Sequence, residues 1–219
     1  MKSSACILGL GKRATLFYQK ELATRLLNGG GDPIHIVQAG FDQINSYMPD
    51  NHSIIKKILK PAFQEIIEKG FSHVIAPNIT IHKILDEIEL PFELIHPIEL
   101  MHRKLASCKL PIIILGTRHT SKNSFIGKVV SDRGFEVVSA EDETIKKVDK
   151  LRQNIYNLTE SDDQVIDFNT LVHRLSFSFT VVIACTELTI VNLHSDRSLD
   201  LGQLQIEEAT KIMLKKHQQ

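Results

Sequence analysis

The chain has few of the residues that mark several classes of protein. Its 219 residues include no tryptophan and only three tyrosines and three cysteines. The odd number of cysteines (Cys6, Cys108 and Cys185), without paired spacing, argues against a disulfide framework and against a zinc site. The ten histidines contain no HxxxH or HxH pair. We therefore expect no bound metal.

An excess of charge and a long hydrophobic run are also missing. The 26 basic residues balance 26 acidic residues, so a nucleic-acid partner receives no electrostatic support. No apolar stretch approaches the roughly 18 residues of a membrane span, and no segment of signal-peptide type follows residues 1–4. We expect a cytoplasmic protein that binds neither nucleic acid nor a membrane.

Short apolar runs rich in β-branched residues recur along the chain. Such continuous runs are typical of strands buried on both faces of a parallel sheet. The runs lie at 5–8, 34–37, 74–76, 92–95, 112–115, 135–138 and 180–184.

Segments with helix-like spacing of apolar residues lie between these runs. They are 16–27, 54–68, 98–106, 125–130, 145–158, 165–175 and 204–214. We expect Pro61 to kink or split the second of them. The alternation predicts an α/β fold with a functional site in the loops at strand ends.

A weak internal repeat divides the chain. The sequence ILG occurs at 7–9 and again 107 positions later at 114–116, and Cys185 follows Asn78 by the same offset. The repeat predicts two similar lobes, each a largely parallel sheet flanked by helices, with the active site in the cleft between them. We expect the first lobe to comprise 1–98 plus about 200–219, and the second to comprise 99–199.

Cys185 is the strongest single candidate for chemistry. Free cysteine is most often a small buried hydrophobe, and both Cys6 and Cys108 fit that structural role. Cys185 differs because it ends the apolar run FTVVIA and precedes Thr186 and Glu187. A helix that begins there would stabilise a thiolate.

The turn at Gly9 and Gly11 contains half of a dinucleotide-binding fingerprint. The third glycine is missing and no acidic residue closes the next expected strand, so the pattern does not favour a nucleotide. Two glycines suit close approach of backbone N–H groups to a small anion such as a carboxylate.

A second turn follows Gly116 and adds the hydroxyl donors Thr117 and Thr120. The alternative is an ordinary strand-to-helix turn in which Thr120 or Ser121 is the N-cap. The residues leave both alternatives open.

Four short segments together resemble the aspartate/glutamate racemase family. They are GLGKRAT at 9–15, PNITIH at 77–82, LGTRHT at 115–120 and ACTEL at 184–188. The second is similar to the family's first catalytic motif, usually Pro-Cys-Asn-Thr-small-His, and the fourth to its second catalytic motif. Asp200 falls where the family has an aspartate before its last helix. The segments follow the family's order and spacing and span nearly the whole chain.

This resemblance implies a homodimeric, cofactor-independent racemase for a small dicarboxylic amino acid, aspartate or glutamate. A cysteine on each side of Cα would remove or return the α-proton. Catalysis would fall to Cys185 and to the position of Asn78, and substrate binding to Gly9, Gly11, Thr80, Thr117, Thr186 and Glu187, with Lys12, His82 and Thr120 as further candidates.

The chain departs from the family's pattern at Asn78, where the first cysteine is replaced. An asparagine has no proton that ionises in the working range. We therefore expect racemisation to be impaired or one-sided, with Cys185 as the one effective base. The segment TESDD at 159–163 also lacks the substrate-binding lysine that family members often have there, and Lys12 or Arg13 at the glycine turn is a candidate to compensate.

Two alternatives remain open from the sequence. One is a decarboxylase, of the arylmalonate type, or an isomerase of the same superfamily that acts on another small acid. Such a decarboxylase delivers one proton, so a single cysteine is sufficient for it. The other is a non-catalytic relative that binds a small ligand.

Overall fold

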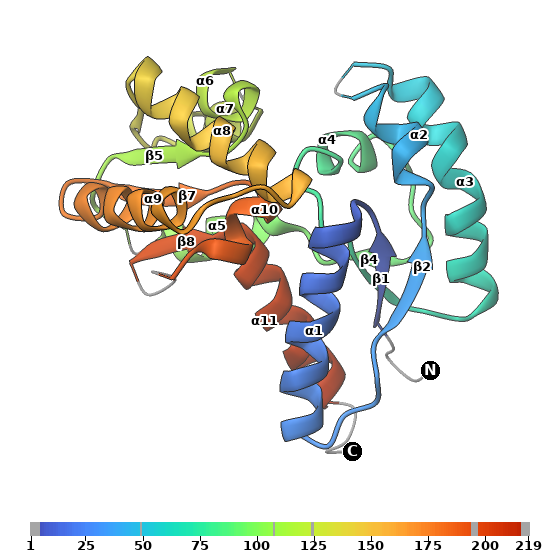
Figure 1. The fold of residues 1–219 in the computed structure, drawn as a ribbon. Helices are drawn as coiled ribbons and strands as arrows, with labels where there is room; N and C mark the ends of the chain where they lie inside the picture. Colours follow the sequence, from blue (N-terminus) through green and yellow to red (C-terminus); the bar gives the residue numbers. More distant parts are fainter. Residues whose placement is uncertain (1–4, 49, 107, 124, 194–196, 216–219) are drawn as a thin grey trace. The chain divides into compact units, whose positions relative to one another are not determined.

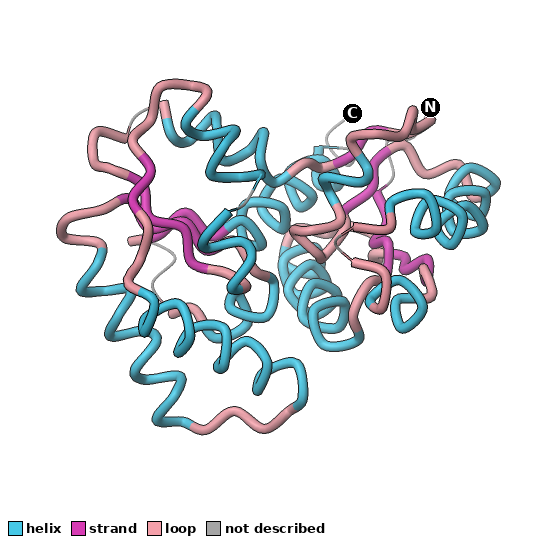
Figure 2. Tube along the Cα trace, turned by 90° about the horizontal axis from the view of Figure 1, so that it is seen from above, coloured by secondary structure: helices cyan, strands magenta, loops and turns pink. Residues whose placement is uncertain are grey.

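The computed structural model describes residues 5–48, 50–106, 108–123, 125–193 and 197–215 (Figure 1). The ends of the expected first lobe, 1–4 and 216–219, lie outside the described residues. The chain divides into two compact units, Met1–His96 with Gln205–Gln219, and Pro97–Leu204. Each unit contains a four-stranded parallel sheet flanked by helices (Figure 2), which confirms the predicted α/β fold class.

The sheet of the first unit has the strand order β2-β1-β3-β4. Its strands are β1 (Ala5–Gly9), β2 (His35–Gln38), β3 (His73–Ile75) and β4 (Glu93–Leu94). Every residue of β1 is buried, as expected for a central strand covered on both faces. In the parallel register Ile7 lies between Ile36 and Ile75, so β1 and β3 end at the same edge of the sheet.

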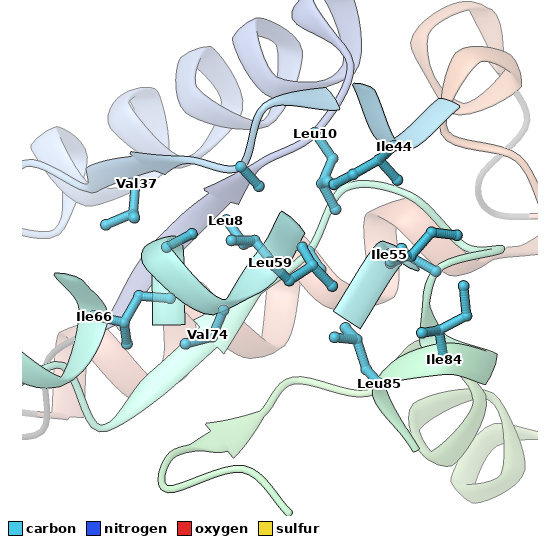
Figure 3. Close-up of a cluster of buried hydrophobic side chains, with 14 of the residues drawn as sticks. Leu8, Leu10, Val37, Ile44, Ile55, Leu59, Ile66, Val74, Ile84 and Leu85 are labelled. Atoms are coloured by element: carbon cyan, nitrogen blue, oxygen red, sulfur yellow. The ribbon is translucent and has the colours of Figure 1, made fainter. Parts of the chain in front are cut away.

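Helices and apolar side chains complete the first unit. The helices are α1 (Lys12–Asn28), α2 (Phe41–Asn45), α3 (His52–Glu68), α4 (His82–Leu85) and α11 (Leu201–Lys215), in which the boundary between the units falls after Leu204. Figure 3 shows side chains of β1, β2 and β3 packed with those of α2, α3 and α4, among them Leu8, Leu59 and Val74. This burial of apolar surface holds the sheet and its helices together.

Pro61 lies inside α3, which continues without a break from His52 to Glu68, so of the expected kink or split the split does not occur. Proline in a helix interior removes one backbone hydrogen bond and costs about 3 kcal/mol. The helix continues because its apolar face is buried on both sides of the proline, by Leu59, Ala62 and Ile66. Each fully buried aliphatic side chain contributes about 1.5–3 kcal/mol, which offsets that cost.

The second unit repeats the arrangement with the strand order β6-β5-β7-β8. Its strands are β5 (Ile112–Leu115), β6 (Val137–Val138), β7 (Thr180–Ile183) and β8 (Ser198–Asp200). Its helices are α5 (Pro97–Leu105), α6 (Arg118–Asn123), α7 (Phe125–Ser131), α8 (Asp142–Asn157), α9 (Asp162–Leu175) and α10 (Thr186–Val191). Among the described residues, no helix is both long and apolar enough to cross a membrane.

The segment TESDD begins a helix. The Ser161 hydroxyl accepts a hydrogen bond from Gln164 N at 3.4 Å, and Gln164 Oε1 accepts from Ser161 N at 3.2 Å. This reciprocal pair is a capping box. Asn154 Nδ2 of α8 also donates to Gln164 Oε1 at 2.9 Å. The side chain of Gln164 thus connects the start of α9 to α8.

Candidate functional site

The turn after β1 has a backbone conformation that favours glycine. Gly11 has a φ of 59° and occupies the N-cap position of α1. Thr15 fastens the turn from inside the helix, because its hydroxyl donates to the Leu10 carbonyl at 2.7 Å and its N–H donates to the Gly11 carbonyl at 3.0 Å. Lys12, the first residue of α1, is exposed next to this turn. The structure thus places Gly9, Gly11 and Lys12 at the carboxyl end of β1.

Asn78 organises the turn after β3. Its N–H donates to the Ala76 carbonyl at 2.8 Å, and its side-chain Oδ1 accepts from Ile81 N at 3.1 Å. This side-chain-to-backbone bond closes the turn that leads into α4, a role that suits asparagine. Thr80 lies in the same turn and is half-buried. The amide of Asn78 therefore has a structural role in this turn.

His82 is fully buried in a hydrogen-bond network within the first unit. Its Nδ1 lies 2.9 Å from the Asn78 carbonyl, so Nδ1 carries the proton and Nε2 accepts from Gln205 Nε2 at 3.3 Å. Gln205 also donates to the Ile95 carbonyl and accepts from the Tyr18 hydroxyl. Burial lowers the pKa of His82 to about 3, an effect to which neighbouring histidine charge adds. The network holds a neutral imidazole and links α1, α4 and α11.

We predict that His82 makes the protein less stable in acid. The unfolded chain takes up a proton on this residue below its ordinary pKa of about 6.5, whereas the folded chain does so only near pH 3. The contribution of His82 to the free energy of unfolding is fully present above pH 6.5 and declines as the pH falls towards 3. Between pH 7.5 and 5.0 the free energy of unfolding should drop by about 2 kcal/mol more in the wild type than in His82→Gln.

Urea unfolding followed by circular dichroism at the two pH values measures this difference. His119→Gln serves as the control, because His119 is exposed and should leave the wild-type pH dependence intact. An equal loss of stability between pH 7.5 and 5.0 in the wild type and in His82→Gln would contradict the prediction that His82 is the residue responsible.

The turn after β5 is closed by threonine hydroxyls. Thr117 Oγ1 accepts from Thr120 N at 3.0 Å and lies 2.8 Å from Thr120 Oγ1, so Thr117, rather than Thr120 or Ser121, caps α6. Gly116 N donates to Ser121 Oγ at 3.1 Å. A Cβ on Gly116 would lie 3.0 Å from the Ala184 carbonyl oxygen. Glycine thereby allows the turns after β5 and β7 to approach each other.

Cys185 lies two residues beyond the end of β7 and occupies the N-cap position of α10. Its Sγ donates to Glu187 Oε2 at 3.1 Å, and the Thr186 hydroxyl donates to the same oxygen at 3.3 Å. The thiol is 5% exposed. Burial raises the pKa of Cys185 well above its ordinary value, and the charge and hydrogen bond of Glu187 add to the effect. The thiol is therefore protonated at neutral pH and donates its hydrogen bond to the Glu187 carboxylate.

Arg152 is a charged neighbour of Cys185 that the sequence reasoning missed. It lies on α8 with its side chain 23% exposed, and its Nε donates to Asp149 Oδ1 at 2.8 Å. Burial lowers the pKa of Arg152, yet the net shift is upward because of the Asp149 hydrogen bond and of electrostatic interactions with Cys185, Asp149 and Glu187. The i, i+3 spacing of Asp149 and Arg152 was visible in the sequence, but the electrostatic interaction of Arg152 with Cys185 was not.

Asp200 ends β8 and anchors the start of α11. It is buried, and it accepts hydrogen bonds from the Thr189 hydroxyl at 2.7 Å, Asn192 Nδ2 at 2.8 Å and the N–H groups of Gly202 and Gln203. Burial raises the pKa of Asp200 while these donors act to lower it. The residue thus ties β8, α10 and α11 together.

A separate open groove of about 640 Å³ lies between α8 and α9. Lys147, Lys150, Phe168 and Arg174 are among the residues that line it. None of the predicted site residues lines this groove. In the described part of the chain, no group of three or more histidine, cysteine or acidic side chains is placed to hold a metal ion.

No protein-family model matches the chain, and no curated protein matches it. Solved structures share its fold. A proposed Asp/Glu racemase from Yersinia pestis is 19% identical, with a TM-score of 0.77 over 98% of this chain and 100% of its own. An aspartate racemase homologue from Pyrococcus horikoshii OT3 is also 19% identical, with a TM-score of 0.77 over 97% and 99%. The aspartate racemase of Picrophilus torridus is 16% identical, with a TM-score of 0.72 over 96% and 94%. These similarities establish a shared fold.

Proposed function

We propose that this protein is a cofactor-independent isomerase of the racemase type, in which Cys185 exchanges the α-proton of aspartate or glutamate. The observation that carries the proposal is the Cys185 Sγ–Glu187 Oε2 hydrogen bond of 3.1 Å at the carboxyl end of a central parallel strand. Open α/β sheets place their ligands at this end. The fold shared with structures named as aspartate racemases supports the same reaction class.

The proposed chemistry begins with transfer of a proton within the hydrogen-bonded pair. Glu187 takes the thiol proton, and the resulting Cys185 thiolate removes the α-proton of the substrate, which leaves a carbanion and a neutral thiol. The Cys185 thiol, after exchange of its proton with solvent, returns a proton to the same face of Cα, and the resulting thiolate recovers its own proton from Glu187. The α-proton is a very weak acid, so donors to the substrate carboxylates must stabilise the developing charge. Thr80, Thr117 and the glycine turn are the proposed donors.

The reaction is proposed to be one-sided because of Asn78. The resemblance assigns this position to the second base, but the Asn78 amide has no ionisable proton and its Oδ1 is bonded to Ile81 N. With one thiol, the protein exchanges the α-proton on one face of Cα. Exchange with retention of configuration should therefore be much faster than racemisation.

Deuterium exchange tests the proposal directly. The protein is incubated in D₂O with L- and D-aspartate and with L- and D-glutamate, and loss of the α-proton signal is followed by NMR. We expect labelling of one enantiomer of at least one substrate, with little conversion to the other enantiomer. Absence of labelling with all four compounds would rule out the proposed reaction.

A second candidate function, decarboxylation of a malonate-type acid, is favoured by the protonation state of Cys185. Burial raises the pKa of this thiol well above its ordinary value, so the resting residue is a proton donor. A decarboxylase delivers one proton to the carbanion formed when CO₂ leaves, and it needs a single such donor. Release of CO₂ from malonate-type acids, without α-proton exchange in aspartate or glutamate, would favour this function over the first.

A further inference from the structure

The proposed function makes no use of the open groove between α8 and α9. The two helices pack together within the second unit (Figure 1), and no predicted site residue lines the groove. Its volume of about 640 Å³ falls within the range of small-molecule sites. The side chains of its walls therefore decide which class of ligand it fits.

Positive charge dominates the walls of the groove. Four basic and two acidic side chains line it, although the chain as a whole has no net charge. Lys147 and Lys150 of α8 and Arg174 of α9 are exposed, and none of the three forms an ion pair with another described residue. The groove thus presents three cations from two helices without a counter-ion in the described part of the chain.

The carboxylates of α8 and α9 leave this charge unbalanced. Glu143 Oε2 lies 4.0 Å from Lys146 Nζ, and Asp149, which does not line the groove, is hydrogen-bonded to two other side chains of α8. Asp167 is the other acidic residue of the walls, and it forms no ion pair with a described residue. The walls keep a surplus of two positive charges, which a dianion would balance.

Gln164 adds a fixed hydrogen-bond donor near the start of α9. Its Oε1 accepts from Asn154 Nδ2 at 2.9 Å and from Ser161 N at 3.2 Å, which uses both lone pairs of this oxygen. The two bonds hold the amide in one orientation, and its Nε2 has no acceptor among the described residues. Because Gln164 lines the groove, its two Nε2–H groups are left for an anion.

The apolar residues of the groove argue against a partner helix. Val148, Leu151 and Phe168 line it, but each is 3% exposed because it packs into the core of the second unit. An amphipathic helix that docks in a groove needs exposed apolar surface for its anchors. A nucleic acid would need a basic surface beyond the groove, and the chain has no excess of basic residues. Charge and hydrogen bonds are therefore the means of recognition here.

We propose that the groove between α8 and α9 binds a small organic molecule with two or more negative charges, held by Lys147, Lys150 and Arg174 and by the amide of Gln164. Phosphate esters and polycarboxylates share this chemistry. Charge-assisted hydrogen bonds supply most of the affinity, and the carboxylate of Asp167 opposes binding. This binding does not depend on the proposed function, since no residue assigned to catalysis lines the groove.

Titration of the full chain with citrate and with glycerol phosphate, followed by ¹H–¹⁵N NMR, tests the proposal. We expect saturable shifts of amide signals from α8 and α9 with at least one of the two anions, and none with uncharged glycerol. A higher salt concentration should weaken binding, because it screens exposed charges. A response to citrate alone would identify a polycarboxylate as the ligand, and a response to glycerol phosphate alone would identify a phosphate ester.

Substitutions in the walls should change the affinity in opposite directions. Lys147→Gln and Arg174→Gln are each expected to weaken binding about tenfold, the effect of one charge-assisted hydrogen bond. Asp167→Asn removes the opposing carboxylate and should strengthen binding about threefold, a gain that misfolding cannot produce. Lys60→Gln on α3 is the matched control, since Lys60 is exposed and forms no ion pair with a described residue. It should leave the affinity unchanged.

Absence of saturable shifts with both anions up to about 10 mM would overturn the proposal. Binding that Lys147→Gln and Arg174→Gln leave intact would also overturn it, because the anion would then lie elsewhere on the chain. An oligoglutamate peptide or an oligonucleotide that binds more tightly than both small anions would show that the partner is a macromolecule instead. Failure of α-proton exchange in the wild type would count against the proposed function alone, since these titrations use no substrate.

Discussion

Replacement of Cys185 by serine is expected to reduce α-proton exchange by about 10³-fold, because general acid–base groups contribute about 10²–10⁴-fold to catalysis. The serine hydroxyl can still donate to Glu187 Oε2, as the thiol does at 3.1 Å. It is a far weaker acid than a thiol, however, and cannot supply the anionic base. The hydrogen bond is thus kept while the proton transfer is lost.

The measurement is the rate of deuterium incorporation at Cα for the substrate that the wild type labels. Cys108→Ser is the matched control, since Cys108 is a half-exposed thiol that donates to the Lys104 carbonyl at 3.7 Å and lies outside the candidate site. We expect this variant to retain wild-type exchange. A Cys185→Ser protein that keeps more than a tenth of the wild-type rate would show that another group is the base.

Replacement of Asn78 by cysteine is expected to increase racemisation by about 100-fold. The substitution supplies a thiol at the position that the resemblance assigns to the missing base, and one positioned acid or base contributes about 10²–10⁴-fold. The same change removes the oxygen that accepts from Ile81 N at 3.1 Å. We therefore expect a stability loss of about 1 kcal/mol, comparable to loss of a helix cap.

Chiral chromatography of the reaction with a single enantiomer measures the gain in conversion. Asn78→Ala is the control, because it loses the amide without adding a thiol, and the double variant Asn78→Cys, Cys185→Ser tests whether both thiols are needed. Equal conversion by Asn78→Cys and Asn78→Ala would contradict the assignment of position 78 to a second base.

The sequence predicted the long elements of the fold better than the short ones. The expected strands at 5–8 and 112–115 correspond closely to β1 (Ala5–Gly9) and β5 (Ile112–Leu115), because their continuous apolar runs suit burial on both faces. The three-residue strand β8 was missed, since its pairing with β7 depends on hydrogen bonds to a distant segment. The short helix α4 was missed because it has too few residues to show a period.

The candidate site was likewise predictable only in part from the sequence. The sequence placed Asn78 and Cys185 after buried strands, and in the structure they follow β3 and β7, which belong to separate parallel sheets. The hydrogen bond of Asn78 Oδ1 to Ile81 N is local and could in principle have been foreseen. The influence of Arg152 on Cys185 could not, since it depends on how α8 packs against α10.

The sequence by itself determined the α/β class and the polar turns at strand ends, because hydrophobic period and residue chemistry are local properties. Only the tertiary structure decided the environments of these groups. Burial and the approach of Glu187 keep the Cys185 thiol protonated, and burial keeps His82 neutral. A pKa depends on solvent exclusion and on charges brought together from distant parts of the chain, and folding establishes both.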